Sequence, residues 1–116
     1  LVRFEDIGIY QLLFTTRDDV YVHRFVDRQL GALVRYDRDN DVGLVETLDR
    51  YFECNCSVKH VADQMHIHRN TVNKRIQLIK ALLTDNTLKG MDRTNLEMAI
   101  IAWKIFVQEG GSDHEE

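Results

Sequence analysis

Apolar residues between positions 57 and 83 recur with the spacing of two short helices. In the first segment they follow the spacing i, i+3, i+4, i+7, and in the second the spacing i, i+4, i+7, i+11. The two sets are Val58, Val61, Ala62 and Met65, and then Val72, Ile76, Ile79 and Leu83. Ser57 is a favourable N-cap for the first helix, and the segment 66–68 interrupts the pattern. The sequence therefore predicts two helices that bury facing stripes around a tight turn, as in a helix-turn-helix.

Three further helices are predicted before this pair. The first covers residues 7–15 with Asp6 as its cap, and the second covers residues 19–34. The charged stretch 36–41 is predicted to be a loop that ends at Asp41, the expected N-cap of the third helix. That helix carries Leu44, Leu48, Tyr51 and Phe52 on one face. It should support the helix-turn-helix and complete a three-helix core over about residues 42–83.

A last helix is predicted after a connector at residues 84–91. It begins near Asp92 or at Thr94, where residues 94–97 have the form of a capping box, and it ends at Gly110-Gly111. This helix is apolar on nearly all sides, so it needs two partners. One partner is the body of the domain, and the other is either the N-terminal helices or the same helix of a second subunit. The intrachain option is favoured for most of the helix, and a homodimer stays open, with Leu78 as a candidate contact.

Composition favours an all-α fold, because the 116 residues include no proline and six glycines. We expect an N-terminal helical segment at 1–41, a helix-turn-helix domain with its C-terminal packing helix at 42–109, and a disordered tail at 110–116. No apolar run reaches the roughly 18 residues of a membrane helix, and no signal peptide is recognisable, which favours a cytoplasmic location. The chain opens without an initiator Met, so we expect a fragment whose sensing portion is missing.

The second helix of the pair, at about residues 69–83, carries side chains suited to DNA. Opposite its apolar stripe lie Asn70, Lys74 and Gln77, with Asn73 on one flank and Arg69 in the first turn. Amides and cations of this kind reach adenine and guanine edges, whereas Thr71, Arg75 and Lys80 lie where phosphate contacts usually come from. The predicted DNA-binding residues are His68, Arg69, Asn70, Thr71, Asn73, Lys74, Arg75, Gln77 and Lys80. The alternative is an ordinary solvated helix face.

The charge of the chain is unevenly distributed. The formal net charge is −4, yet residues 57–82 carry five Lys and Arg against one Asp, a local charge of +4. Residues 1–53 and 83–116 each come to −4. A small basic segment on an acidic body fits a protein that touches double-stranded DNA through one element, because the rest repels phosphates.

Two other kinds of chemistry receive little support. Cys54, Cys56, His60, His66 and His68 are ligand-type residues, but their spacing matches no common zinc pattern, so neither a metal nor a cofactor is expected. Cys54 and Cys56 are also too close for an ordinary disulfide. Asp18, Asp19 and His23 could form an acid-base cluster, but helix capping explains them better, and no enzymatic activity is expected.

The segment 61–76 resembles the C-terminal helix-turn-helix of the PucR and CdaR (sugar-diacid regulator) transcription factors. Its most specific part is the run Ile67-His68-Arg69-Asn70-Thr71 before a hydrophobic residue, continued by Arg75-Ile76. The helix at 44–52 looks like the family's L-x-x-T-L-x-x-Y-hydrophobic helix, and residues 4–8 look like the segment that precedes it. The resemblance covers nearly the whole chain.

The resemblance implies a bacterial regulator whose present portion binds operator DNA. A separate N-terminal portion would sense a metabolite of purine, sugar-diacid, amino-acid or similar catabolism. The family often has Tyr-Arg where this chain has Lys74-Arg75, and Ser-Glu-x-Ala where it has residues 59–62. These differences leave the fold unaffected but bear on the operator sequence. The alternative function is a helix-turn-helix used for protein contacts or dimerisation.

Overall fold

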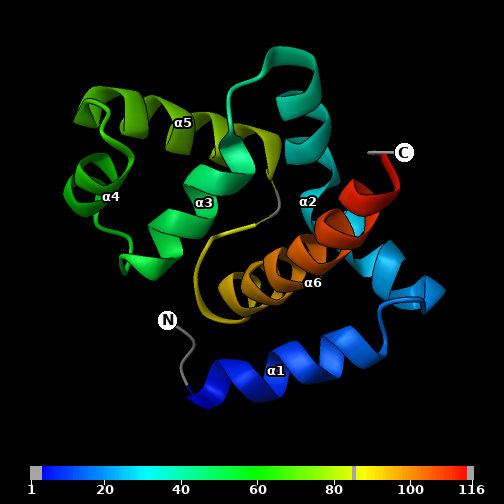
Figure 1. The fold of residues 1–116 in the computed structure, drawn as a ribbon. Helices are drawn as coiled ribbons and strands as arrows, with labels where there is room; N and C mark the ends of the chain where they lie inside the picture. Colours follow the sequence, from blue (N-terminus) through cyan, green and yellow to red (C-terminus); the bar gives the residue numbers. More distant parts are fainter. Residues whose placement is uncertain (1–3, 85, 115–116) are drawn as a thin grey trace.

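The computed structural model describes residues 4–84 and 86–114, with side chains for residues 8–84 and 86–107. These residues form six helices and no strand, which confirms the all-α prediction. The helices are α1 (Phe4–Thr15), α2 (Val20–Asn40), α3 (Leu44–Glu53), α4 (Val58–Met65), α5 (Arg69–Leu82) and α6 (Gly90–His114). Figure 1 shows α3, α4 and α5 grouped at one side of the molecule, with α6 running between α2 and α1.

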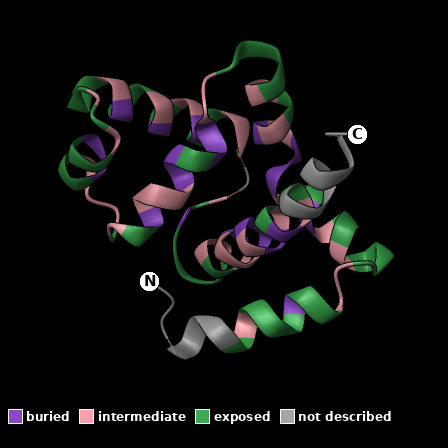
Figure 2. Cartoon of the chain, viewed as in Figure 1, coloured by how far each residue is buried: buried purple, intermediate pink, exposed green. Residues whose placement is uncertain are grey.

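Helices α3, α4 and α5 form the predicted three-helix core. The stripe of α5 is closed to solvent, since Val72 and Ile79 are 0% exposed and Ile76 is 4% exposed. Leu48 of α3 and Val61 of α4 are also 0% exposed. In Figure 2 the buried residues lie on the sides of these helices that face one another. The periodic apolar spacing of the sequence therefore produces the packing that it predicts.

Helix α6 finds its two partners within the chain. It packs on α2, on α1 and on α3, which confirms the favoured intrachain option. Its buried residues lie on several sides of the helix and include Leu96, Ala99, Ile100, Ala102 and Ile105. A helix that is apolar on nearly all sides is thus covered by three helices from the N-terminal half of the chain.

The loop predicted at residues 36–41 is wrong, because α2 continues as a helix to Asn40. No glycine or proline interrupts this stretch, and its charged side chains at 38–41 are exposed, so the helix continues along the surface. Asp41 is the C-cap of α2 in the left-handed region (φ 53°), and its N–H donates to the Asp37 carbonyl at 2.7 Å. It is therefore not the N-cap of α3.

The predicted ends of two other helices also differ from the structure. α1 begins at Phe4, before the proposed cap at Asp6, and α6 begins at Gly90 rather than at Asp92 or Thr94. The Asp92 carboxylate accepts hydrogen bonds from the Thr87 backbone N–H (3.0 Å) and hydroxyl (2.8 Å), which lowers the pKa of Asp92. The connector is thus tied to the first turn of α6.

At its other end, α6 continues through the two glycines to His114, so Gly110-Gly111 does not end it. Residues 110–114 are therefore helical rather than disordered as predicted, and residues 115–116 lie outside the described residues. None of the helices in the described ranges combines the length and hydropathy needed to cross a membrane.

We expect Leu48→Ala to lower the free energy of unfolding by about 2–5 kcal/mol, because it opens a cavity in the three-helix core. The control is Leu12→Ala on α1, where the side chain is 58% exposed, with an expected change within about 0.5 kcal/mol. Urea unfolding measures both. Equal losses for the two variants would contradict this account of the core.

Candidate nucleic-acid interface

The turn between α4 and α5 is fixed by its own backbone and by two caps. The Ser57 hydroxyl accepts a hydrogen bond from the His60 N–H at 3.3 Å, which confirms the predicted N-cap of α4. His66 ends α4 in the left-handed region (φ 58°), and the Ile67 N–H donates to the Ala62 carbonyl at 3.1 Å. Ile67 then packs against the core. These bonds turn the chain within three residues, so α5 starts at a defined angle.

His68 is the N-cap of α5. Its Nδ1 accepts a hydrogen bond from the Asn70 backbone N–H at 3.0 Å. A backbone N–H can only donate, so Nδ1 carries a lone pair and the proton of the neutral ring sits on Nε2. His68 is exposed, and its Nε2–H remains available as a donor beside the first turn of α5. Sequence reasoning placed His68 among the DNA contacts but missed its role as a cap.

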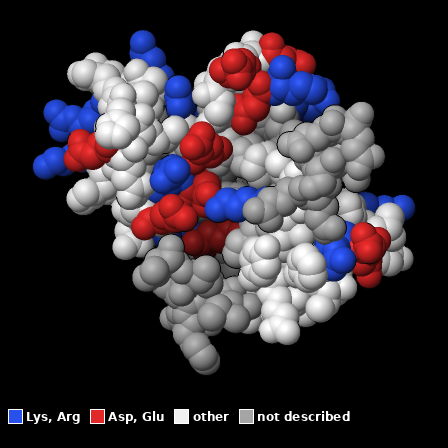
Figure 3. Space-filling view, viewed as in Figure 1, with Lys and Arg blue, Asp and Glu red and all other residues white. Residues whose placement is uncertain are grey.

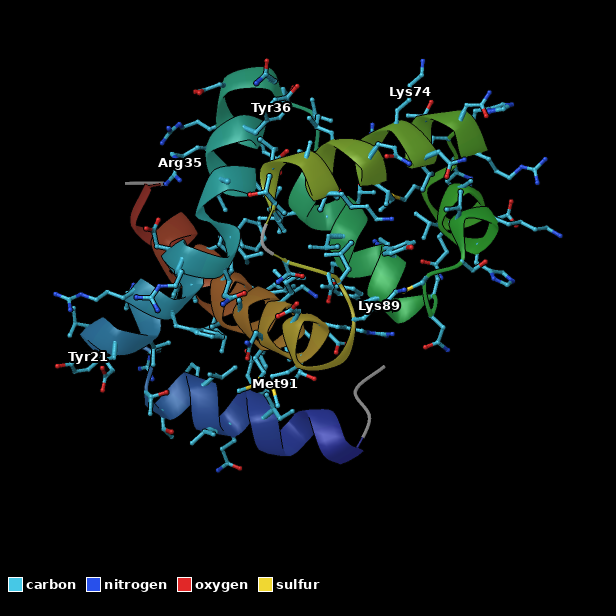
Figure 4. All side chains as sticks on the ribbon, turned by 180° about the vertical axis from the view of Figure 1, so that it is seen from behind. Tyr21, Arg35, Tyr36, Lys74, Lys89 and Met91 are labelled. Atoms are coloured by element: carbon cyan, nitrogen blue, oxygen red, sulfur yellow. The ribbon has the colours of Figure 1, made fainter. Side chains whose placement is uncertain are left out.

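The predicted base-reading residues lie together on the outer face of α5. Arg69, Asn70, Asn73, Lys74 and Gln77 are all exposed, as is Lys80 farther along the helix. Within the part of the chain that the structure describes, their side chains make no hydrogen bond or ion pair. Figure 4 shows Lys74 pointing away from the body, at the end of the molecule opposite α1. This face is therefore free to meet a ligand.

Two of the predicted residues lie on the flank of α5 instead. Thr71 and Arg75 are half-buried, and Arg75 Nη1 donates to the Thr47 hydroxyl oxygen of α3 at 3.2 Å. Thr47 is 0% exposed and donates its own proton to the Gly43 carbonyl at 2.8 Å. The guanidinium of Arg75 is thus partly engaged within the protein. The helical pattern could not reveal this bond, which joins residues 28 positions apart.

Basic side chains are concentrated on the outer side of α4 and α5. In Figure 3, Lys and Arg side chains lie at the outer edge of α4 and α5, while Asp and Glu side chains gather over α3 and the end of α2, where Lys and Arg side chains lie beside them. Lys59 of α4 is exposed and adds to the basic edge, and Asp63 is the acidic residue of the segment 57–82. A polyanion is therefore attracted to one end of the molecule.

Arg93 of α6 supports the turn between α3 and α4. Its Nη2 donates to the Phe52 carbonyl at 3.0 Å, and its guanidinium carbon lies 5.1 Å from the centre of the Phe52 ring. The turn contains two non-glycine residues with positive φ, Asn55 at 53° and Cys56 at 65°, a conformation that costs free energy. Sequence reasoning missed this contact, because its partners are 41 residues apart.

The residues considered as metal ligands or as an acid-base cluster lie in a turn, in a helix cap and in a packing contact. Cys54 and Cys56 are half-buried in the α3–α4 turn, and the described residues include no group of three potential metal ligands. Burial and the Glu53 carboxylate raise the pKa of the Cys54 thiol, which makes it a poorer metal ligand. Asp19 is the N-cap of α2, and the His23 ring stacks on Phe106 with centroids 4.0 Å apart.

A capped helix, a tight turn and a second helix with an exposed basic and amide face define a helix-turn-helix DNA-binding domain. The family model of the PucR C-terminal helix-turn-helix domain matches residues 44–102, about half of the chain. The chain belongs to this family, whose members are domains of transcriptional regulators rather than enzymes.

Two curated relatives come from Bacillus subtilis (strain 168). The DNA-binding transcriptional activator AdeR is 33% identical over 82 residues, which cover 71% of this chain and 19% of AdeR. The proline-responsive transcriptional activator PutR is 27% identical over 102 residues, which cover 88% of this chain and 25% of PutR. The chain thus spans about a fifth to a quarter of the length of these relatives. No solved structure matches it.

We expect His68→Ala to lower the free energy of unfolding by about 0.5–2 kcal/mol, because the first turn of α5 loses its N-cap. His68→Asn is the matched control, since an Asn oxygen caps the same N–H group. Urea unfolding followed by circular dichroism measures both variants. If the Asn variant loses as much stability as the Ala variant, the capping role assigned to the ring is incorrect.

Proposed function

We propose that α5 enters the major groove of operator DNA and reads base edges with Arg69, Asn70, Asn73, Lys74 and Gln77. The observation that carries this proposal is the exposed outer face of α5, whose polar side chains have no partner among the described residues. Lys and Arg side chains pair with guanine, and Asn and Gln side chains pair with adenine, through two hydrogen bonds each. A helix with free cations and amides is therefore suited to sequence-specific contact.

Phosphate contacts come from the edges of this face. We assign them to Thr71, to Lys80 and to the Nε2–H of His68, which lie beside the base-reading residues. Such contacts fix the register of the helix on the duplex. The acidic body repels phosphates elsewhere, so it favours approach through α4 and α5.

At the level of the whole regulator, we propose that this domain acts together with a separate effector domain that binds a small molecule. The two relatives are four to five times longer than their matched segments, which leaves room for such a domain in proteins of this kind. Because operator DNA is intracellular, we place the regulator in the cytoplasm.

The alternative, a helix-turn-helix that binds an acidic protein partner, predicts a different response to salt. Binding to DNA releases counterions, so the affinity falls steeply as the salt concentration rises. An acidic protein partner carries no comparable layer of condensed counterions, so its affinity should fall less steeply over the same range of salt concentration.

We expect the double variant Asn70→Ala with Lys74→Ala to fold normally and to lose its preference for the selected operator. Each base-pair contact contributes about 1–3 kcal/mol of discrimination, so the loss should exceed tenfold. The operator is first selected from random duplexes with the wild-type chain, and affinities are then measured by fluorescence anisotropy.

The matched control is Arg28→Ala with Gln11→Ala, which also removes one basic and one amide side chain but from the exposed surfaces of α2 and α1. It should bind as the wild type does. A double variant on α5 that still protects the operator normally would refute the assignment of this face.

We also propose that the chain binds DNA as a homodimer, since two half-sites about one helical turn apart give useful affinity to a small module. The two dimer contacts considered from the sequence, Leu78 and the last helix, pack within the chain instead. Leu78 packs against the core, and α6 packs on α1, α2 and α3. Light scattering with and without the selected duplex should give the mass of two chains per duplex. Footprinting on the same duplex should show a symmetric protected region. One chain on a single half-site would contradict the proposal.

A further inference from the structure

We propose that Asp37 and Thr47 are positioning residues for the DNA-reading helix α5, so that operator binding depends on the end of α2 as well as on the helix-turn-helix. This inference rests on the proposed function of α5 and deepens it. The observation behind it is a series of hydrogen bonds that runs from α2 through the first turns of α3 to Arg75 of α5.

The first link is an N-cap that comes from another helix. The residue before α3 is Gly43, which has no side chain and makes no capping bond. The Asp37 carboxylate takes this place, since one oxygen accepts from the Leu44 N–H at 2.6 Å and the other from the Val45 N–H at 3.0 Å. Two charge-assisted bonds to the positive end of α3 hold this helix at a defined position relative to α2.

The second link is Thr47, which lies one turn farther along α3. Its hydroxyl has a single proton, and that proton is donated to the Gly43 carbonyl at 2.8 Å. The oxygen therefore presents only acceptor lone pairs to its other neighbour, Arg75 Nη1 at 3.2 Å. Because Thr47 is 0% exposed, no solvent molecule can readily replace this partner. The bond is directional and lies between α3 and α5.

The hydrogen bond between Arg75 and Thr47 restricts a rotation of α5 that apolar packing alone permits. Val72, Ile76 and Ile79 hold α5 against the core, but apolar contacts are non-directional and tolerate small rotations of a helix. Reading base edges requires side chains placed to within about 0.5 Å. A hydrogen bond from the flank of α5 to a buried hydroxyl restricts that rotation and so sets the direction of the base-reading face.

The inferred unit is larger than the segment that defines the family. The family model matches residues 44–102, whereas Asp37 lies before residue 44. The carboxylate that caps α3 therefore belongs to the end of α2, the stretch that the sequence pattern suggested was a loop. A fragment that starts at Leu44 would keep Thr47 and Arg75 but lose the cap.

The same contact also distinguishes two roles for Arg75. If its guanidinium mainly binds Thr47, then Arg75 orients α5 and contributes no counterion release. If it instead neutralises a phosphate, its loss reduces the slope of log K against log salt by about 0.9. The inference requires the first behaviour.

The experiment compares Thr47→Val, which keeps the shape but removes the hydroxyl, with Thr47→Ser, which keeps the hydroxyl. It also compares Asp37→Ala and the milder Asp37→Asn with the control Asp39→Ala, whose exposed side chain makes no bond to α3. All variants are made in the full 116-residue chain. Binding to the duplex selected by the wild-type chain is measured below the unfolding transition over a series of salt concentrations.

We expect Thr47→Val, which loses the bond from Arg75, and Asp37→Ala, which loses the two bonds that cap α3, to weaken binding to the selected duplex by about tenfold each. Asp37→Asn should fall between Asp37→Ala and the wild type, while Thr47→Ser and Asp39→Ala stay within about twofold. The salt slope should not change. Since both residues act through one route, the loss in Asp37→Ala with Thr47→Val should be smaller than the product of the single losses.

Three results would overturn the inference. The first is lower thermal stability of the Thr47 and Asp37 variants with unchanged operator affinity, which would make both residues merely structural. The second is a salt slope reduced by about 0.9 in an Arg75→Ala variant measured beside the others, which would make Arg75 a phosphate contact. The third is strict multiplication of the two single losses, which would show that the residues act independently.

NMR of the free chain separates failure of the inference from failure of the proposed function. Asp37→Ala should speed hydrogen exchange at the Leu44 and Val45 amides, and Thr47→Val but not Thr47→Ser should shift amide resonances along residues 69–77. If the wild-type chain selects no duplex, the proposed function fails, yet these spectra still test the helix positions. Unchanged α5 resonances in Thr47→Val would refute the inference whatever the DNA result.

Discussion

The structure depends on the burial of one side of α5. Val72, Ile76 and Ile79 follow one another at intervals of four and three residues, so they share one side of the helix, and all three are at most 4% exposed. Residues about half a turn away, such as Asn70, Lys74 and Gln77, then have to face solvent. The exposed polar face is thus a geometric consequence of the buried one, and α3 and α4 provide the surface that covers it.

Helix α6 contributes to this arrangement from a distance. Its apolar residues pack on α1, α2 and α3, and Arg93 in its first turns holds the α3–α4 turn through the Phe52 carbonyl. That turn sets the entry of α4, and α4 in turn sets the entry of α5. The long C-terminal helix therefore does more than cover apolar surface, because it stabilises a backbone geometry that leads to the DNA-reading element.

Local periodicity accounts for most of what could be predicted, and contacts between distant residues account for what could not. The spacing of Val61, Val72 and Ile76 predicted α4 and α5, and Ser57 predicted the start of α4. The stretch 36–41 reads as a loop because it is polar, but a polar helical turn is stable when its residues face solvent. Asp37, Arg75 and Arg93 have partners 7, 28 and 41 positions away, and no spacing rule identifies such pairs.

Charge pairing explains why a chain with a net charge of −4 can still approach DNA at one end. On the body several cations lie beside carboxylates, as in Lys104–Asp49 at 2.6 Å and Arg50–Glu46 at 3.7 Å. Such pairs stabilise the fold little when exposed, and their fields largely cancel at a distance. Within the described residues the cations of Arg69, Lys74 and Lys80 have no such partner. The field that a duplex meets is therefore positive where α5 projects and negative or neutral over the body, so the distribution of pairs, rather than the total charge, sets the direction of approach.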